Sequence, residues 1–116
     1  MKNIQHFDLK ALKTFTNASD SSLLQYIEIY SEQTPQEISQ LENSLKKNKL
    51  KELKAYAHNM KSKARYMGLE SLADIAEKIE KTDASNEQIS ELIENFKTLF
   101  ADIKTEMKHE KEKLHI

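Results

Sequence analysis

Residues 50–68 read LKELKAYAHNMKSKARYMG, and the spacing of the apolar side chains in this stretch decides the fold. The apolar residues recur at intervals of three or four, which is the period of one face of an α-helix. The single glycine of the chain, Gly68, comes directly after the run, where a helix most easily ends in a left-handed residue. The stretch therefore predicts a helix over about 49–67 followed by a chain reversal. Its buried face is expected to contain Leu50, Leu53, Ala57, Met60, Ala64 and Met67.

The same reasoning, applied outward, predicts helices along nearly the whole chain. Asp8 caps a short helix that ends near Asn17, and an apolar stripe then runs through 20–47. Pro35 lies inside this stripe, but the apolar residues before and after it keep the same angular register, which favours one long, kinked helix. Asn48 is expected to cap the helix that follows.

Two further helices complete the pattern. One has Leu69, Leu72, Ile75, Ala76 and Ile79 on its apolar face and ends before Thr82, and the other begins at the capping box formed by Ser85 and Gln88. Four long segments with short connections pack most simply as an all-α, antiparallel, up-and-down four-helix bundle with a short additional N-terminal helix. We expect one domain over 1–116, with frayed ends at 1–7 and 108–116.

Composition limits the classes of function. The chain has 116 residues, of which 38% are hydrophobic, with one Gly, one Pro and no Cys. Disulfides, thiolate catalysis and cysteine-ligated zinc are therefore excluded. No long apolar run suggests a signal peptide or a membrane span, so we expect a cytoplasmic protein without a membrane partner. Nothing resembles a Gly-rich nucleotide loop, so no ATP site is expected.

Charged residues are unevenly distributed along the chain, although the net charge is only −1. Eight basic residues and one acid, Glu52, lie between Lys46 and Arg65. On a helical projection His58 falls in an arc beside the apolar stripe, and the other members of that arc are basic or small. They are Lys51, Lys54, Lys61, Ser62 and Arg65. We expect these cations, with no acid near them, to favour the neutral, nucleophilic imidazole and to attract a phosphoryl group.

The run Ala57-His58-Asn59-Met60-Lys61, continuing to Gly68, resembles the signature of histidine-containing phosphotransfer (HPt) domains. That signature has an alanine-histidine pair, a hydrophobic residue two positions after the histidine, lysine three after it and glycine ten after it. The likeness covers roughly residues 8–105. In this family, four-helix bundles carry a phosphoryl group between aspartates of receiver domains.

The resemblance implies a role for each matched residue. His58 corresponds to the phosphoacceptor, which reacts through Nε2, Lys61 to the lysine that stabilises the phosphoryl group, and Gly68 to the glycine that closes the helix. Ser62 departs from the family, which usually has glycine there, and leaves transfer efficiency and partner choice open.

The resemblance also implies partners and a cofactor pattern. The partners would be response-regulator receiver domains or a hybrid histidine kinase, and the receiver would supply Mg²⁺, so no cofactor is expected on this chain. It would be a phosphoryl carrier rather than an enzyme with kinase activity. Lys54 and Arg65 would attract an acidic receiver pocket, while Ala57 and Ser62 would contact the receiver directly.

Two other classes of function stay open. One is a helical scaffold that binds a receiver or another partner without being phosphorylated, which Ser62 would support. The other is a nucleic-acid binder that uses the basic segment, but Tyr56 and Tyr66 lie on a different face from the lysines and give no stacking platform among them. We expect a monomer.

Overall fold

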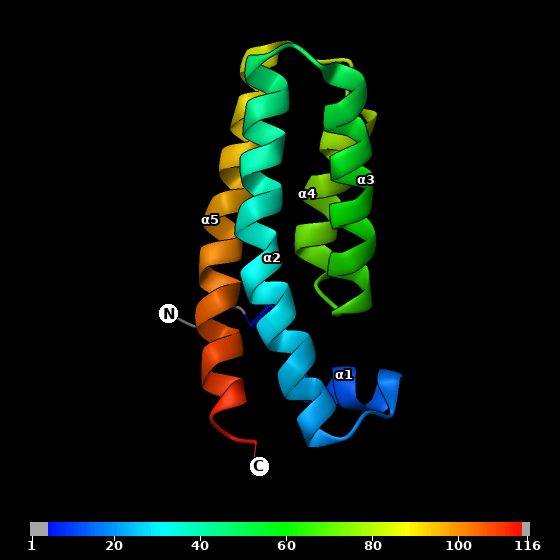
Figure 1. Ribbon diagram of the computed structural model, residues 1–116, viewed down its shortest axis with the longest axis vertical. Helices are drawn as coiled ribbons and strands as arrows, with labels where there is room; N and C mark the ends of the chain where they lie inside the picture. The colour runs from blue at the N-terminus through cyan, green and yellow to red at the C-terminus, as the bar shows by residue number, and fades with distance from the viewer. Residues whose placement is uncertain (1–4, 115–116) are drawn as a thin grey trace.

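The computed structural model describes residues 5–114. The described part contains five helices and no strand. They are α1 (Leu9–Thr16), α2 (Asp20–Lys46), α3 (Leu50–Tyr66), α4 (Glu70–Lys81) and α5 (Asn86–Lys111). The predicted all-α bundle of four long helices, preceded by one short helix, is confirmed (Figure 1).

The four long helices pack as neighbours around one apolar core. Helix α2 contacts α3 and α5, and α4 contacts the same two helices from the other side. Helices α2 and α5 extend past the end of the α3–α4 pair, and α1 lies at this extended end (Figure 1). The predicted stripe of α3 is buried at Leu53, Ala57 and Met60, and farther along at Ala64 and Met67. This burial fixes which face of α3 is left for function.

Helix α2 continues through Pro35, as the register of its stripe predicts. Proline has no N–H to donate to the carbonyl four residues earlier, so the helix loses one hydrogen bond there. The preceding residue, Thr34, is buried and donates its hydroxyl to the Tyr30 carbonyl at 2.7 Å. The axis of α2 changes direction near its middle (Figure 1). One kinked helix therefore spans the bundle.

Two left-handed residues close α2 and α3 in the same way. Gly68 has φ +75°, and the Leu69 N–H donates to the Ala64 carbonyl at 2.8 Å, which is a Schellman ending. Asn48 has φ +56° and ends α2 by the same arrangement, so the prediction that it caps α3 is wrong. Lys49 precedes α3 without a side-chain cap, and Leu50 is exposed rather than part of the core. Asparagine serves both as an N-cap and as a left-handed residue, and here the second use prevails.

The chain ends are better ordered than the composition predicts. Helix α5 continues to Lys111, and at the other end Phe7 is fully buried. The Glu106 carboxylate accepts hydrogen bonds from the backbone N–H groups of His6 and Phe7 at 2.7 and 2.8 Å. The prediction of frayed ends is therefore wrong for residues 6–7 and 108–111, while 1–4 and 115–116 lie outside the described residues. No helix of the described part is long and apolar enough to cross a membrane.

Candidate functional site

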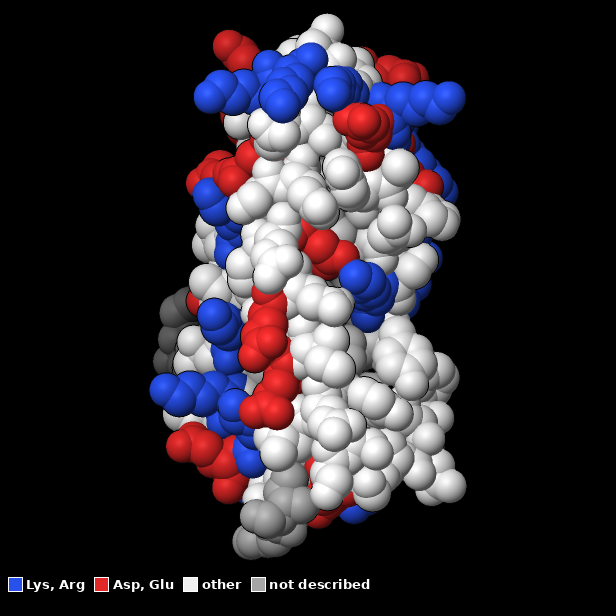
Figure 2. Space-filling view, viewed as in Figure 1, with Lys and Arg blue, Asp and Glu red and all other residues white. Residues whose placement is uncertain are grey.

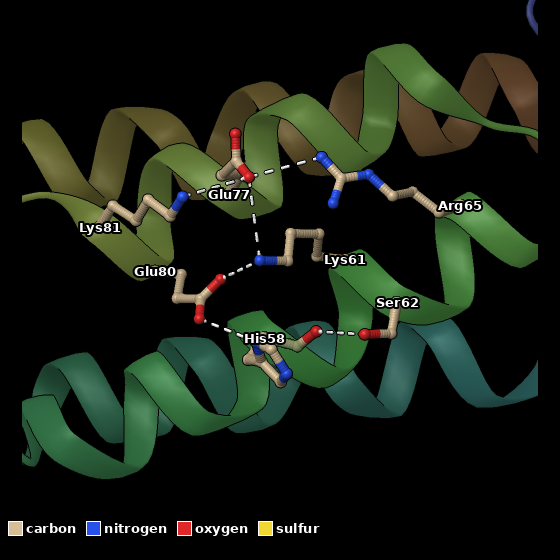
Figure 3. A network of polar contacts seen from close by, with 7 residues as sticks. All are labelled: His58, Lys61, Ser62, Arg65, Glu77, Glu80 and Lys81. Carbon is tan, nitrogen blue, oxygen red and sulfur yellow. Dashed lines mark hydrogen bonds and ion pairs between the residues drawn. The ribbon is translucent and has the colours of Figure 1, made fainter.

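His58 lies on the flank of α3 next to the buried stripe, on the side of α4. Its neighbours Ala57 and Met60 are buried, which fixes the rotation of the helix, and its own side chain is 56% exposed. The Nδ1 atom of His58 lies 2.8 Å from Oε2 of Glu80, a residue of α4 (Figure 3). The imidazole is thus held at one nitrogen while much of the ring faces solvent.

Glu80 also binds Lys61, one helical turn after His58. The ammonium of Lys61 donates to Oε1 of Glu80 at 2.6 Å, and Lys61 is only 8% exposed. This hydrogen bond from Lys61 is the main cause that lowers the pKa of the Glu80 carboxyl, with a smaller contribution from the bond to His58 and an opposing one from desolvation. Glu80 is therefore a carboxylate near neutral pH, shared by the histidine and the lysine.

The prediction that no acid lies near His58 is wrong, because α4 supplies Glu80 and, one turn earlier, Glu77. Oε1 of Glu77 lies 3.4 Å from Arg65 and 3.8 Å from the ammonium of Lys61. Lys54 lies 3.9 Å from Asp83, which follows α4. A helical projection of α3 alone does not show the acids that a neighbouring helix adds. At the α2–α3 turn Lys49 pairs with Glu52, three positions farther along the chain, and Figure 2 shows several basic side chains at that end of the molecule.

This geometry prepares His58 as a nucleophile. A carboxylate can only accept a hydrogen bond, so Nδ1 carries the proton in the contact with Glu80. In the neutral ring Nε2 then has the free lone pair, and this nitrogen is the one that a phosphoryl group can reach from solvent. Glu80 would also stabilise positive charge that develops on the ring when Nε2 forms a bond. Glu80, rather than the predicted ring of cations, thus sets the tautomer and the orientation of the imidazole.

Comparison with protein families agrees with this arrangement. The model of the Hpt domain matches residues 25–108, which is most of the chain. The chain belongs to the Hpt domain family. Hpt domains are four-helix phosphotransfer carriers of phosphorelays, and they generally interact with receiver domains. No curated protein and no solved structure matches the chain.

The other site residues predicted for this Hpt domain have different surroundings. Ser62 is exposed one turn after His58, and its hydroxyl donates to the His58 carbonyl at 3.2 Å. Arg65 and Lys54 are partly exposed, as a role in attracting a partner requires. Ala57 has no exposed surface, so the interpretation of Ala57 as a docking contact is wrong. It belongs to the apolar stripe that holds α3 in the bundle.

An apolar hollow of about 350 Å³ lies between α2 and α3, and Ser62 on its wall is one helical turn after His58. Two large hydrophobic side chains on its wall are strongly exposed, Ile29 at 51% and Tyr66 at 49%, and Phe15 of α1 packs edge-on against Tyr66. Figure 2 shows this region as a broad uncharged face beside the bundle's charged edges. The hollow is lined by Tyr26, Ile29, Tyr30, Gln33, Ser62, Lys63, Tyr66 and Met67.

Sequence reasoning missed three parts of this site: Glu80, Glu77 and the apolar hollow. The two acids are spaced three apart in the predicted fourth helix, at the edge of its apolar stripe, so they share one flank. Joining that flank to α3 across the Gly68 turn would have placed them near Lys61. Within residues 5–114 no group of three or more histidine, aspartate or glutamate side chains is arranged to hold a metal ion.

Proposed function

We propose that His58 accepts a phosphoryl group from an aspartyl phosphate of one receiver domain and passes it to the aspartate of another. The observation that carries this proposal is the contact of Nδ1 with Glu80 at 2.8 Å on an exposed imidazole, because it fixes the tautomer that leaves Nε2 free. Membership of the Hpt domain family supports the same reaction. The chain acts in it as a carrier and co-substrate.

The transfer step needs no oxidant or further reactant. Nε2 of His58 donates its lone pair to phosphorus, the bond from phosphorus to the aspartyl oxygen breaks, and the receiver's aspartate leaves as a carboxylate. The ring then carries a positive charge, with its Nδ1 proton held by Glu80. Reversal of the step on a second receiver restores the neutral imidazole. Any Mg²⁺ in the reaction belongs to the acidic site of the receiver.

Lys61 is the group on this chain best placed to stabilise the phosphoryl oxygens. It lies one turn from His58, and its ammonium lies against Glu80 in the unphosphorylated protein. A phosphoryl group on Nε2 brings up to two negative charges, for which Lys61 would leave Glu80. Glu80 still accepts the hydrogen bond from Nδ1 of His58, so its carboxylate retains a donor after Lys61 has moved.

The receiver would dock on the apolar hollow between α2 and α3. Ser62 lines the hollow and lies one turn after His58, so a domain seated there covers the histidine. The exposed Ile29 and Tyr66 are the kind of large apolar side chains that anchor protein interfaces. Lys63 lines the hollow and Arg65 lies on the α4 side of α3, and their charges would suit a partner with an acidic site.

The test is incubation of the protein with receiver domains that carry a labelled aspartyl phosphate. We expect an acid-labile, base-stable label on the wild-type protein and none on His58→Gln. His109→Gln is the matched control, since His109 is an exposed histidine at the far end of α5, and it should be labelled as well as wild type. Binding of receivers without any label on the wild-type protein would refute the carrier role and indicate a scaffold.

A further inference from the structure

Glu77 joins three cations at the seam between α3 and α4. Its Oε1 atom lies 3.4 Å from Arg65, 3.5 Å from Lys81 and 3.8 Å from Lys61 (Figure 3). Lys81 is the main cause that lowers the pKa of the Glu77 carboxyl, and Arg65 adds to the effect. Glu77 is therefore negatively charged near neutral pH. It does not contact His58 itself, so any effect on the histidine acts through the cations it holds or through its charge at a distance.

The cations that Glu77 holds are the ones a phosphoryl group on His58 would attract. Lys61 lies between two carboxylates, at 2.6 Å from Glu80 and 3.8 Å from Glu77. Arg65 is the next basic side chain along the same arc of α3 and is bound by Glu77. Each of these contacts must weaken before its cation can turn toward phosphate oxygens. The strength of the contacts thus sets how well phosphohistidine is stabilised.

We propose that Glu77 is a positioning residue that lowers the stability of phosphorylated His58 by keeping Lys61 and Arg65 engaged. The inference rests on the proposed function. The consequence is a shift of the transfer equilibrium away from phosphorylated His58, so that the phosphoryl group passes readily from Nε2 to a receiver aspartate. In that step the bond from nitrogen to phosphorus breaks, a bond to the aspartyl oxygen forms, and the neutral imidazole returns.

The charges involved give the size of the effect. Removal of Glu77's charge releases Arg65 and leaves Lys61 with Glu80 as its carboxylate partner. It also removes a repulsion between a carboxylate and the phosphoryl dianion, and both changes favour phosphohistidine. The repulsion alone, for charges about 10 Å apart in water, corresponds to an equilibrium shift of about fourfold. Release of the cations acts in the same direction, so at low ionic strength the expected shift exceeds about fourfold.

A purely structural role for Glu77 would have a different signature. If Glu77 only fastened α3 to α4, its replacement would lower the free energy of unfolding and leave the transfer equilibrium of the folded protein unchanged. Exposed ion pairs of this kind contribute little to stability. Glu77→Gln should therefore stay folded, which circular dichroism would verify before the transfer is measured.

The experiment measures the equilibrium constant between phosphorylated His58 and a phosphorylated receiver, approached from both directions. At low ionic strength, Glu77→Gln should shift it at least about fourfold toward phosphohistidine. Glu94→Gln is the matched control and should give the wild-type constant. The Glu94→Gln substitution removes the same charge from the protein. Lys97, the partner of Glu94, also binds Glu42 of α2, so this ion-pair cluster lies on the α2–α5 side of the bundle, away from the α3–α4 seam.

A second comparison tests the route through the lysine. In a Lys61→Met background, the shift caused by Glu77→Gln should be smaller than in the wild-type background and no more than about fourfold, because the main cation to be released is gone and only the repulsion and Arg65 remain. If Glu77→Gln and Glu94→Gln give the same constant while the wild-type protein is labelled, this inference is wrong and the proposed function stands. A wild-type protein that takes no label overturns both.

Discussion

Replacement of Glu80 by alanine should slow the phosphorylation of His58 about tenfold. Glu80 accepts a hydrogen bond from the protonated Nδ1 of His58. Without this carboxylate, no hydrogen bond favours one tautomer of the imidazole over the other. Part of the population then presents a protonated Nε2, which cannot attack phosphorus. The positive charge that grows on the ring during attack also loses its carboxylate.

The magnitude follows from the geometry of the contact. A hydrogen bond to a charged group contributes about 1.5–3 kcal/mol. The 2.8 Å distance from Nδ1 to Glu80 indicates a well-formed bond, but the His58 side chain is 56% exposed, so water competes for the same proton. We therefore take the lower limit, about 1.5 kcal/mol, which corresponds to a rate change of about tenfold.

The assay is the initial rate of label transfer from one phosphorylated receiver at several concentrations of the Glu80→Ala protein. The loss should be in the maximal rate, because Glu80 is not among the residues that line the docking hollow. Asp74→Ala is the control on the same helix, an exposed acid outside the His58 network. The maximal rate of Glu80→Gln should lie between those of the two alanine variants, since an amide oxygen can still accept a hydrogen bond from Nδ1. A Glu80→Ala protein that is folded and as fast as wild type would refute the role given to Glu80.

Three further predictions concern docking, the fold and pH. Ile29→Asp should weaken receiver binding at least about tenfold, measured by titration calorimetry, because it places a charge in an apolar interface; unchanged affinity would move the docking surface elsewhere. Gly68→Ala should lower the free energy of unfolding in urea by about 1 kcal/mol, because the added Cβ meets open space and only φ +75° is strained; a neutral result would contradict the left-handed turn. Because the folded-state pKa of Glu80 is lowered from 4.5, its contribution to stability is present above pH 4.5 and is lost as pH falls through the lower value. The difference in unfolding free energy between wild type and Glu80→Gln should therefore shrink with acidification below pH 4.5, and a constant difference would disprove the linkage.

The helices were predictable from the sequence because each is set by its own residues. Spacing of apolar side chains places the buried face, and local caps such as Ser85 with Gln88 place the ends. The errors occurred where one residue type has two local uses or where a distant contact decides. Asn48 fits both a cap and a left-handed turn, and Phe7 is held by Glu106, 99 positions along the chain. Neither outcome can be read from neighbouring residues.

The candidate site was predictable only on the helix that bears the motif. His58 and Lys61 lie one turn apart, so their proximity follows from helix geometry. Glu80 follows His58 by 22 positions, and its contact depends on how α3 and α4 turn relative to each other. The error at Ala57 has another origin. Its place in the apolar stripe already predicted burial, which the structure confirms, whereas the motif alone drew attention to it as a contact.

Ser62 shows how a departure from the family pattern can be judged from local geometry. The resemblance leads one to expect glycine there, and glycine inside a helix costs about 1 kcal/mol relative to alanine. The Ser62 hydroxyl donates back to the His58 carbonyl at 3.2 Å, so its proton is already used within the helix rather than offered to a phosphoryl group. What remains for a partner is the added bulk, since Ser62 also lines the apolar hollow. We therefore expect that a receiver docking beside His58 would need a small side chain or a backbone segment opposite Ser62, so that this residue would select partners rather than take part in the transfer.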